Sequence, residues 1–138
     1  MCRSYHQFLQ KGGCLFVAGN GGSAADSRHI VAELVSKLSK NRTPIRGLIK
    51  REDVFLGITT SGNSKNVVRA FQACREIGCA SILLTGGNGG ECLSPADQVI
   101  RVPSSETGLM QEAHIVIYHT LCFLIEQGLI TSGLCKYI

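Results

Sequence analysis

Residues 14–40 constrain the fold more than any other part of the chain. A short apolar run, residues 15–17, leads into a glycine-rich corner at residues 19–22 and then into a predicted amphipathic helix that Ser23 or Asp26 opens. Backbone N–H groups at a helix start lack intrahelical partners, and together with the helix dipole they favour an anion such as phosphate. The pattern predicts a strand, a tight turn and a helix, with either an anion site or an ordinary polar turn at the corner.

One turn inside this helix, His29 and Glu33 stand four residues apart and therefore project from the same face. A His/Glu pair beside an anion corner is typical of a catalytic or metal site. A solvated polar helix face is the alternative interpretation.

Three further apolar runs have the length of buried strands, at residues 53–59, 80–85 and 98–102. Helical patterns separate or follow them, at residues 65–77 and 110–127, and Gly78 stands where a helix C-cap glycine belongs. Strands alternating with helices predict βαβ crossovers and one parallel sheet. Ligands of such sheets bind at the carboxyl ends of the strands, where the corners lie.

The corner at residues 59–64 is rich in hydroxyl groups, which come from Thr59, Thr60, Ser61 and Ser64. A phosphate monoester accepts several hydrogen bonds at once, so these hydroxyls at a helix start favour a phosphate site over a plain capped turn. The third corner, residues 86–91, is interpreted as mainly a flexible turn. No lysine follows any corner at the P-loop position. The last helix carries Gln111, His114 and His119 on an apolar body, where lone histidines are usually core or interface residues.

Composition excludes several classes of protein. Six of the fourteen Lys and Arg lie in residues 37–51 without interleaved aromatic residues, so the net charge of +4 does not predict nucleic-acid binding. Seven cysteines without a CxxC motif are typical of reduced core thiols, and hence of a reducing compartment. The N-terminus has no apolar run of signal-peptide length, and no segment is expected to reach the length of a membrane span. We therefore expect a cytoplasmic protein.

Three segments also carry a resemblance: GNGGSAADSRHIVAEL, GITTSGNSKNVVRAFQACREIGCASILLTG and IRVPSSETGLMQEAHIVIYHTLCFLIEQGL. In this order they resemble the sugar isomerase (SIS) domain, and within it the phosphoheptose isomerases. The resemblance implies a single SIS domain over residues 1–138, with a three-layer α/β sandwich, a central parallel sheet and flavodoxin-like topology. It also implies interconversion of sedoheptulose 7-phosphate and D-glycero-D-manno-heptose 7-phosphate, for bacterial heptose, lipopolysaccharide or capsule synthesis.

The resemblance implies roles for particular residues. Glu33 and His119 match the acid/base pair, and one zinc ion per subunit is expected at His29, Glu33, Gln111 and His119. The implied substrate contacts are Asn20, Gly21, Gly22, Ser23, Thr59, Thr60, Ser61, Ser64 and Gln111. A homotetramer with its active site near a subunit boundary is also implied. The apolar circumference of the last helix independently favours self-association.

The chain departs from the family pattern in two places. Relatives begin with longer N-terminal helices, and between Leu48 and Ile49 this chain lacks a segment that in the family supplies a further strand, helical structure and an Asn-Asp pair. The missing segment favours a second interpretation, a non-catalytic SIS module that binds a phosphosugar or a partner protein. The joint presence of His29, Glu33, Gln111 and His119 favours the isomerase.

Overall fold

The computed structural model describes residues 12–35 and 49–134, and for residues 31–35 it describes the backbone alone. Its sheet has four parallel strands in the order β1-β2-β3-β4. The strands are β1 (Leu15–Gly19), β2 (Val54–Thr59), β3 (Ala80–Gly86) and β4 (Gln98–Val102). Both ends of each strand lie within two residues of the ends of a predicted apolar run. The parallel sheet inferred from these runs is therefore confirmed.

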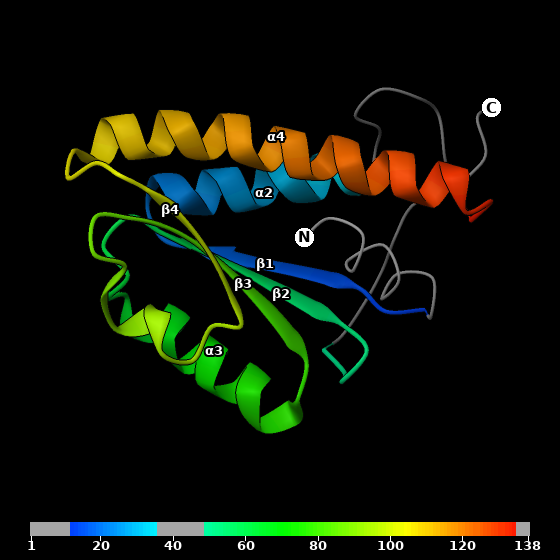
Figure 1. Ribbon diagram of the computed structural model, residues 1–138, viewed down its shortest axis with the longest axis horizontal. Helices are drawn as coiled ribbons and strands as arrows, with labels where there is room; N and C mark the ends of the chain where they lie inside the picture. The colour runs from blue at the N-terminus through cyan, green and yellow to red at the C-terminus, as the bar shows by residue number, and fades with distance from the viewer. Residues whose placement is uncertain (1–11, 36–48, 135–138) are drawn as a thin grey trace.

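Helices cover both faces of this sheet, which gives the predicted three layers (Figure 1). On one face α2 (Gly22–Val35) and α4 (Thr107–Thr131) lie side by side, and on the other lies α3 (Lys65–Ile77). The connection from β3 to β4 contains only η1 (Gly90–Leu93), a short 3-10 helix packed beside α3, so the expected alternation of strand and α-helix is wrong at this step.

The two helical layers bury separate apolar clusters against the sheet. Every residue of β2 is buried, because both its faces are covered. The α2 and α4 face buries Ile30, Val54, Leu56, Ile58, Ile82, Leu84, Tyr118 and Cys122. The α3 face buries Phe55, Val67, Val68, Phe71, Cys74, Cys79, Leu83 and Cys92. Alternate residues of β2 and β3 supply the two clusters, as the two-residue period of a strand requires.

Helix α3 matches its sequence prediction closely. Its bounds are those expected, and its buried face consists of the four predicted residues Val67, Val68, Phe71 and Cys74. Gly78 has φ 79°, and its N–H bonds the carbonyl of Cys74, which is the left-handed cap that glycine favours. The N-cap residue is Ser64, but its hydroxyl makes no capping hydrogen bond. That hydroxyl points back into the preceding corner.

The connection that leads into β2 and the one that leaves it differ in handedness. From β1 to β2 and from β2 to β3 the sheet steps in the same direction, yet α2 and α3 lie on opposite faces. Two right-handed crossovers stepping the same way would place both helices on one face, and nearly all such crossovers are right-handed. A further strand outside β1, reached through α2, would give the first connection the same hand as the second. The connection from β1 to β2, part of which lies outside the described residues, departs from the usual hand.

Four of the predicted core cysteines are buried and form no disulfide among the described residues, namely Cys74, Cys79, Cys92 and Cys122. Burial, with the neighbouring Cys79, raises the pKa of Cys74 to about 12. Such a thiol stays protonated at neutral pH and packs as a small apolar group.

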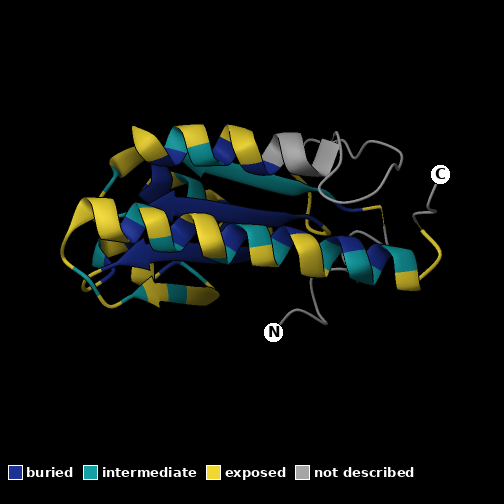
Figure 2. Cartoon of the chain, turned by 90° about the horizontal axis from the view of Figure 1, so that it is seen from above, coloured by how far each residue is buried: buried dark blue, intermediate teal, exposed yellow. Residues whose placement is uncertain are grey.

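Helix α4 corrects one expectation. It is the one helix among the described residues that is long and apolar enough to cross a membrane. It has 25 residues, and its most apolar window has a mean hydropathy of 1.4. The prediction that no segment approaches a membrane span is therefore wrong by length and composition. One face of α4 nevertheless packs on the sheet and on α2, and its outer face exposes apolar side chains (Figure 2). These outward-facing residues explain its high hydropathy.

Candidate active site

The carboxyl ends of all four strands lie at one edge of the sheet, and each strand continues there into a polar loop. After β1 comes Asn20-Gly21, after β2 residues 60–64, after β3 residues 87–89, and after β4 residues 103–106. Parallel strands bring these loops together although the chain separates them by up to some eighty residues. This edge contains most of the predicted substrate contacts.

The corner after β1 is closely packed on its inner side and exposed to solvent on its outer side. A Cβ on Gly19 would lie 2.7 Å from the Cβ of Ser23, so only glycine fits, and Ser23 is buried below the corner. Gly21 adopts φ 55°, the left-handed conformation that allows the turn into α2. Asn20, Gly21 and Gly22 are exposed at the surface, as substrate contacts require, whereas Ser23 is placed as a packing residue.

Gly22 lies directly beneath the side chain of Gln111. A Cβ on Gly22 would approach the Nε2 atom of Gln111 to 2.2 Å. The start of α2 and the second turn of α4 therefore meet here. Gln111 lies within the regular helix α4 (Thr107–Thr131).

The corner after β2 divides its hydroxyls between two tasks. The Thr59 hydroxyl accepts the N–H of Gly62 at 3.2 Å and lies 3.2 Å from the Ser64 hydroxyl, so these two side chains hold the loop in shape. Ser61 Oγ accepts the N–H of Asn63 at 3.2 Å, and Ser61 is exposed while Thr60 is half-buried. Thr60 and Ser61 are the two that line a cavity.

The glycine-rich loop after β3 supports this corner from behind. A Cβ on Gly62 would lie 1.9 Å from the carbonyl oxygen of Gly89, which means that the two backbones touch. The N–H of Cys92 donates to the Gly62 carbonyl and that of Glu91 to Asn63 Oδ1, both at 2.9 Å. The loop is a turn, as predicted, and it also braces the hydroxyl corner, a role that the sequence did not reveal.

A cavity of about 230 Å³ lies between the loops after β2, β3 and β4. Its polar lining combines the predicted Thr60 and Ser61 with groups that sequence reasoning missed, namely Asn88, Ser104, Ser105 and Thr107. The signal for Ser104, Ser105 and Thr107 was a run of hydroxyl residues between a strand and a helix, the same signal that identified the corner after β2. The cavity has an uncharged lining, in which these polar residues stand beside Met110, and it is open to one side.

Further along the two parallel helices, His29 of α2 meets His119 of α4. Their Nε2 atoms are 3.0 Å apart, and the rings stand edge to face with centroids separated by 5.0 Å. The ring of Tyr118 lies 4.9 Å from that of His119 and 5.8 Å from that of His29. His29 is exposed and His119 half-buried, so the pair is accessible from outside. The structure thus brings together two of the four predicted zinc positions.

Between these two contacts, the half-buried Asp26 of α2 and the buried His114 of α4 attract each other across the same helices. His114 is fully buried, and its Nε2 lies 3.3 Å from the carbonyl oxygen of Thr85. Burial lowers the pKa of His114 and raises the pKa of Asp26, and the attraction between the two opposes both shifts. Asp26 Oδ2 and His114 Nδ1 have no hydrogen-bond partner among the described residues. The expectation that lone histidines of the last helix are core residues is confirmed for His114.

Of the two remaining zinc positions, Gln111 lies apart from the histidine pair. Glu33 follows His29 by one turn of α2, but its side chain lies outside the described part of the chain. Gln111 contacts Gly22, two helical turns before His119, or about 12 Å along the axis. No cluster of three His, Cys, Asp or Glu side chains occurs within the described residues. Two ligand nitrogens of a tetrahedral zinc lie about 3.3 Å apart, so the 3.0 Å separation of the histidines fits two ligands of one ion.

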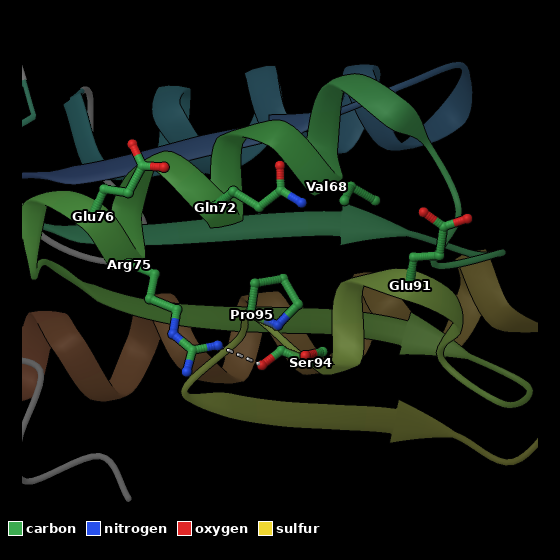
Figure 3. Close-up of a pocket in the computed structure, with 7 residues that line it drawn as sticks. All are labelled: Val68, Gln72, Arg75, Glu76, Glu91, Ser94 and Pro95. Atoms are coloured by element: carbon green, nitrogen blue, oxygen red, sulfur yellow. Dashed lines mark hydrogen bonds between the residues drawn. The ribbon is translucent and has the colours of Figure 1, made fainter.

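A second, larger cavity of about 470 Å³ lies away from this edge, between α3 and the loop around η1 (Figure 3). Its lining residues are Val68, Gln72, Arg75, Glu76, Glu91, Ser94 and Pro95. Arg75 Nη1 donates to the carbonyl of Ser94 at 3.5 Å and closes one end. The cavity shares no residue with the predicted site, so its size does not identify it as the functional one.

Comparison with known proteins finds close relatives of this chain. The phosphoheptose isomerase of Aneurinibacillus thermoaerophilus is 37% identical over 152 aligned positions, which cover 89% of this chain and 77% of the relative. The chain belongs to the phosphoheptose isomerase family. The probable phosphoheptose isomerase of Thermoplasma acidophilum is 36% identical, with 86% of this chain and 81% of the relative covered. No protein-family model matches the chain.

Solved structures of the family have the same fold. The phosphoheptose isomerase of Neisseria gonorrhoeae matches with a TM-score of 0.81 at 31% identity, covering 91% of this chain and 83% of that one. The enzyme of Francisella tularensis matches with a TM-score of 0.82 at 27% identity and the same coverage. The 152 positions aligned with the Aneurinibacillus relative exceed the 138 residues of this chain, so the relative contains residues that this family member lacks.

Proposed function

We propose that the chain catalyses the interconversion of sedoheptulose 7-phosphate and D-glycero-D-manno-heptose 7-phosphate. The observation that carries the proposal is the 3.0 Å approach of His29 to His119 across two helices, in a member of the phosphoheptose isomerase family. A domain that used only the fold would have no need for two accessible imidazoles facing each other. The polar cavity at the strand ends supplies a place for the phosphate at the other end of the substrate.

The phosphate group is proposed to bind in the 230 Å³ cavity, where Thr60 and Ser61 face Ser104, Ser105 and Thr107. Its oxygens accept hydrogen bonds only, and hydroxyl groups can rotate to donate to them. The start of α4 adjoins the cavity at Thr107, so its helix dipole favours the negative charge. From there the sugar extends past Gln111 and Gly22 toward the histidine pair.

Isomerisation moves a proton between two adjacent carbons and a second proton between their oxygens. In the proposal Glu33 removes the carbon-bound proton and returns it to the neighbouring carbon, while His119 exchanges the proton of the oxygens. Glu33 lies one helical turn after His29, whose ring touches that of His119, so the backbone allows both groups to serve one substrate. Gln111 would orient the sugar through its side-chain amide.

A zinc ion is proposed as a resident cofactor, one per subunit, held by His29 and His119 together with Glu33, and with Gln111 as the fourth family position. When bound there, zinc would polarise the substrate carbonyl and so lower the cost of forming a negatively charged oxygen. The support is the ligand-like separation of the two imidazole nitrogens.

The proposal includes a cytoplasmic homotetramer serving bacterial lipopolysaccharide or capsule synthesis. The outer face of α4 exposes Val116 at 67% and Phe123 at 48%, together with Ile115 and Leu124. An apolar face of this kind supports burial against a second copy. A monomeric mass by light scattering at micromolar concentration would contradict the assembly.

The test is turnover of sedoheptulose 7-phosphate by wild type and by Glu33→Gln, with and without added zinc. Loss of the base should lower kcat by roughly 10²–10⁴-fold while the affinity for the phosphosugar changes little. Glu76→Gln is the matched control, because this exposed glutamate lies on α3 beside the distant cavity. Near-normal activity of folded Glu33→Gln would refute the catalytic assignment.

Zinc is tested separately by metal content. His29→Ala should lower the zinc bound per chain after purification, and activity should fall only as far as the metal contributes to it. Equal zinc content in wild type and His29→Ala would remove His29 from the metal site.

A second candidate function is a non-catalytic module that binds a phosphosugar or a partner protein. It is favoured by the residues that the chain lacks relative to the Aneurinibacillus isomerase. A wild-type protein that binds sedoheptulose 7-phosphate without converting it would establish this alternative.

A further inference from the structure

Two asparagine side chains join the corner after β1 to the start of α3. Asn20 Nδ2 donates to Asn66 Oδ1 at 2.7 Å, and Asn66 Nδ2 donates to Asn20 Oδ1 at 3.0 Å. The two residues are 46 positions apart in sequence, and both are exposed. We propose that Asn66 is a positioning residue that fixes the amide of Asn20 for contact with the sugar. This inference rests on the proposed function.

The reciprocal pair fixes orientation because it uses both ends of each amide. Each side chain contributes one N–H and one carbonyl lone pair, so neither amide can flip without losing both hydrogen bonds. Each amide keeps a second N–H and a second lone pair that do not take part. The free N–H and lone pair of Asn20 are then held in one direction beside Gly21 and Gly22.

The two partners differ in how firmly their backbones are held. Asn66 is the second residue of α3, and the next two residues, Val67 and Val68, are buried in the core at 0% and 7% exposure. Asn20 follows the last paired residue of β1 and precedes Gly21, whose surroundings are open. The amide of Asn66 is therefore the fixed partner, and that of Asn20 is the one that it orients.

The position of Asn66 also links the two corners of the site. It follows the hydroxyl corner by two residues, so the amide pair sets the distance between the corner after β1 and the loop of Thr60 and Ser61. A hydrogen bond between exposed neutral side chains adds little to stability. Its contribution is therefore expected in substrate affinity and turnover, with the fold unchanged.

The experiment is a double-mutant cycle of Asn20→Ala and Asn66→Ala, with kcat and KM for sedoheptulose 7-phosphate. Asn66→Ala should lower kcat/KM by roughly 10- to 100-fold, since a misplaced contact can cost that much. Adding it to Asn20→Ala should cause little further loss, because Asn66 acts through Asn20. Gln72→Ala is the matched control, because it removes an exposed side-chain amide from α3 nearly two helical turns after Asn66.

Losses that multiply in the double variant, or a kcat/KM of Asn66→Ala within twofold of wild type, would overturn the inference. An inactive wild type would refute the isomerase, and the same cycle is then measured as the dissociation constant of sedoheptulose 7-phosphate by calorimetry. A second readout does not depend on turnover. The side-chain amide signals of Asn20 in the ¹⁵N spectrum should shift in Asn66→Ala and stay unchanged in Gln72→Ala, and an unshifted signal in Asn66→Ala would also overturn it.

Discussion

Replacement of Gly62 by alanine should destabilise the fold through two separate effects. Gly62 has φ 69°, and a residue with a Cβ costs roughly 1–2 kcal/mol in this left-handed conformation. The added Cβ would also lie 1.9 Å from the carbonyl oxygen of Gly89, which is backbone and cannot rotate aside. The hydroxyl corner and the loop after β3 must then separate.

The separation would strain or break two hydrogen bonds, from Cys92 N–H to the Gly62 carbonyl and from Glu91 N–H to Asn63 Oδ1. At about 0.5–1.5 kcal/mol each, they bring the expected loss of unfolding free energy to roughly 2–5 kcal/mol. Since single domains are stable by about 5–15 kcal/mol, Gly62→Ala should remain folded but melt at a clearly lower temperature.

Gly87→Ala separates the two effects. Gly87 also has a left-handed backbone, with φ 49°, but a Cβ there would come no closer than 3.7 Å to another residue. Urea unfolding followed by circular dichroism should therefore give a loss of about 1–2 kcal/mol for Gly87→Ala and a larger loss for Gly62→Ala. If the two variants lose the same free energy, the backbone contact between the loops contributes nothing and the reasoning is refuted.

Three other predictions address the site. Ser61→Ala, which removes a hydroxyl that lines the cavity, should weaken sedoheptulose 7-phosphate binding by roughly 1.5–3 kcal/mol for a lost bond to a charged group, and unchanged affinity by calorimetry would place the phosphate elsewhere. Gly22→Ala should displace the Gln111 amide, 2.2 Å from the new Cβ, and lower kcat/KM while the melting temperature hardly changes; Gly108→Ala, where the space is open, serves as control. His114 has a lowered pKa in the folded state, so the free energy of unfolding should fall as pH drops below the ordinary histidine pKa of about 6.5, by up to about 1.4 kcal/mol per pH unit. The urea midpoints of His114→Gln should lack this part of the pH dependence. A pH profile identical to that of wild type would contradict the prediction.

The sequence predicted the elements whose signals are local. Helix α3 was placed correctly because its apolar spacing, its N-terminal serine and Gly78 all lie within sixteen residues. The strands were found because residues covered on both faces form continuous apolar runs. The two corners were recognised as candidate anion sites for the same reason, since glycine and hydroxyl residues cluster at the helix starts.

Features that depend on distant residues could not be predicted. The amide pair of Asn20 and Asn66 spans 46 residues, and no spacing rule links two exposed asparagines. The family resemblance grouped Gln111 with His119, but on a continuous helix eight residues carry the chain about 12 Å, and the two side chains meet different parts of α2. The bracing of Gly62 by Gly89 likewise requires knowing which loops are neighbours at the sheet edge.

The contacts between α2 and α4 determine the rotation and the axial position of one helix against the other. Helix α4 is apolar around most of its circumference, so hydrophobic burial alone would accept several rotations and several shifts along its axis. The contacts of Gly22 with Gln111 and of His29 with His119 agree with only one of these arrangements. A shift by a single residue would turn the polar side chains of α4 by about 100° away from their partners. The same side chains proposed for binding and catalysis thus also fix the register of the two helices, and substitutions among them that spare the fold should still loosen this alignment.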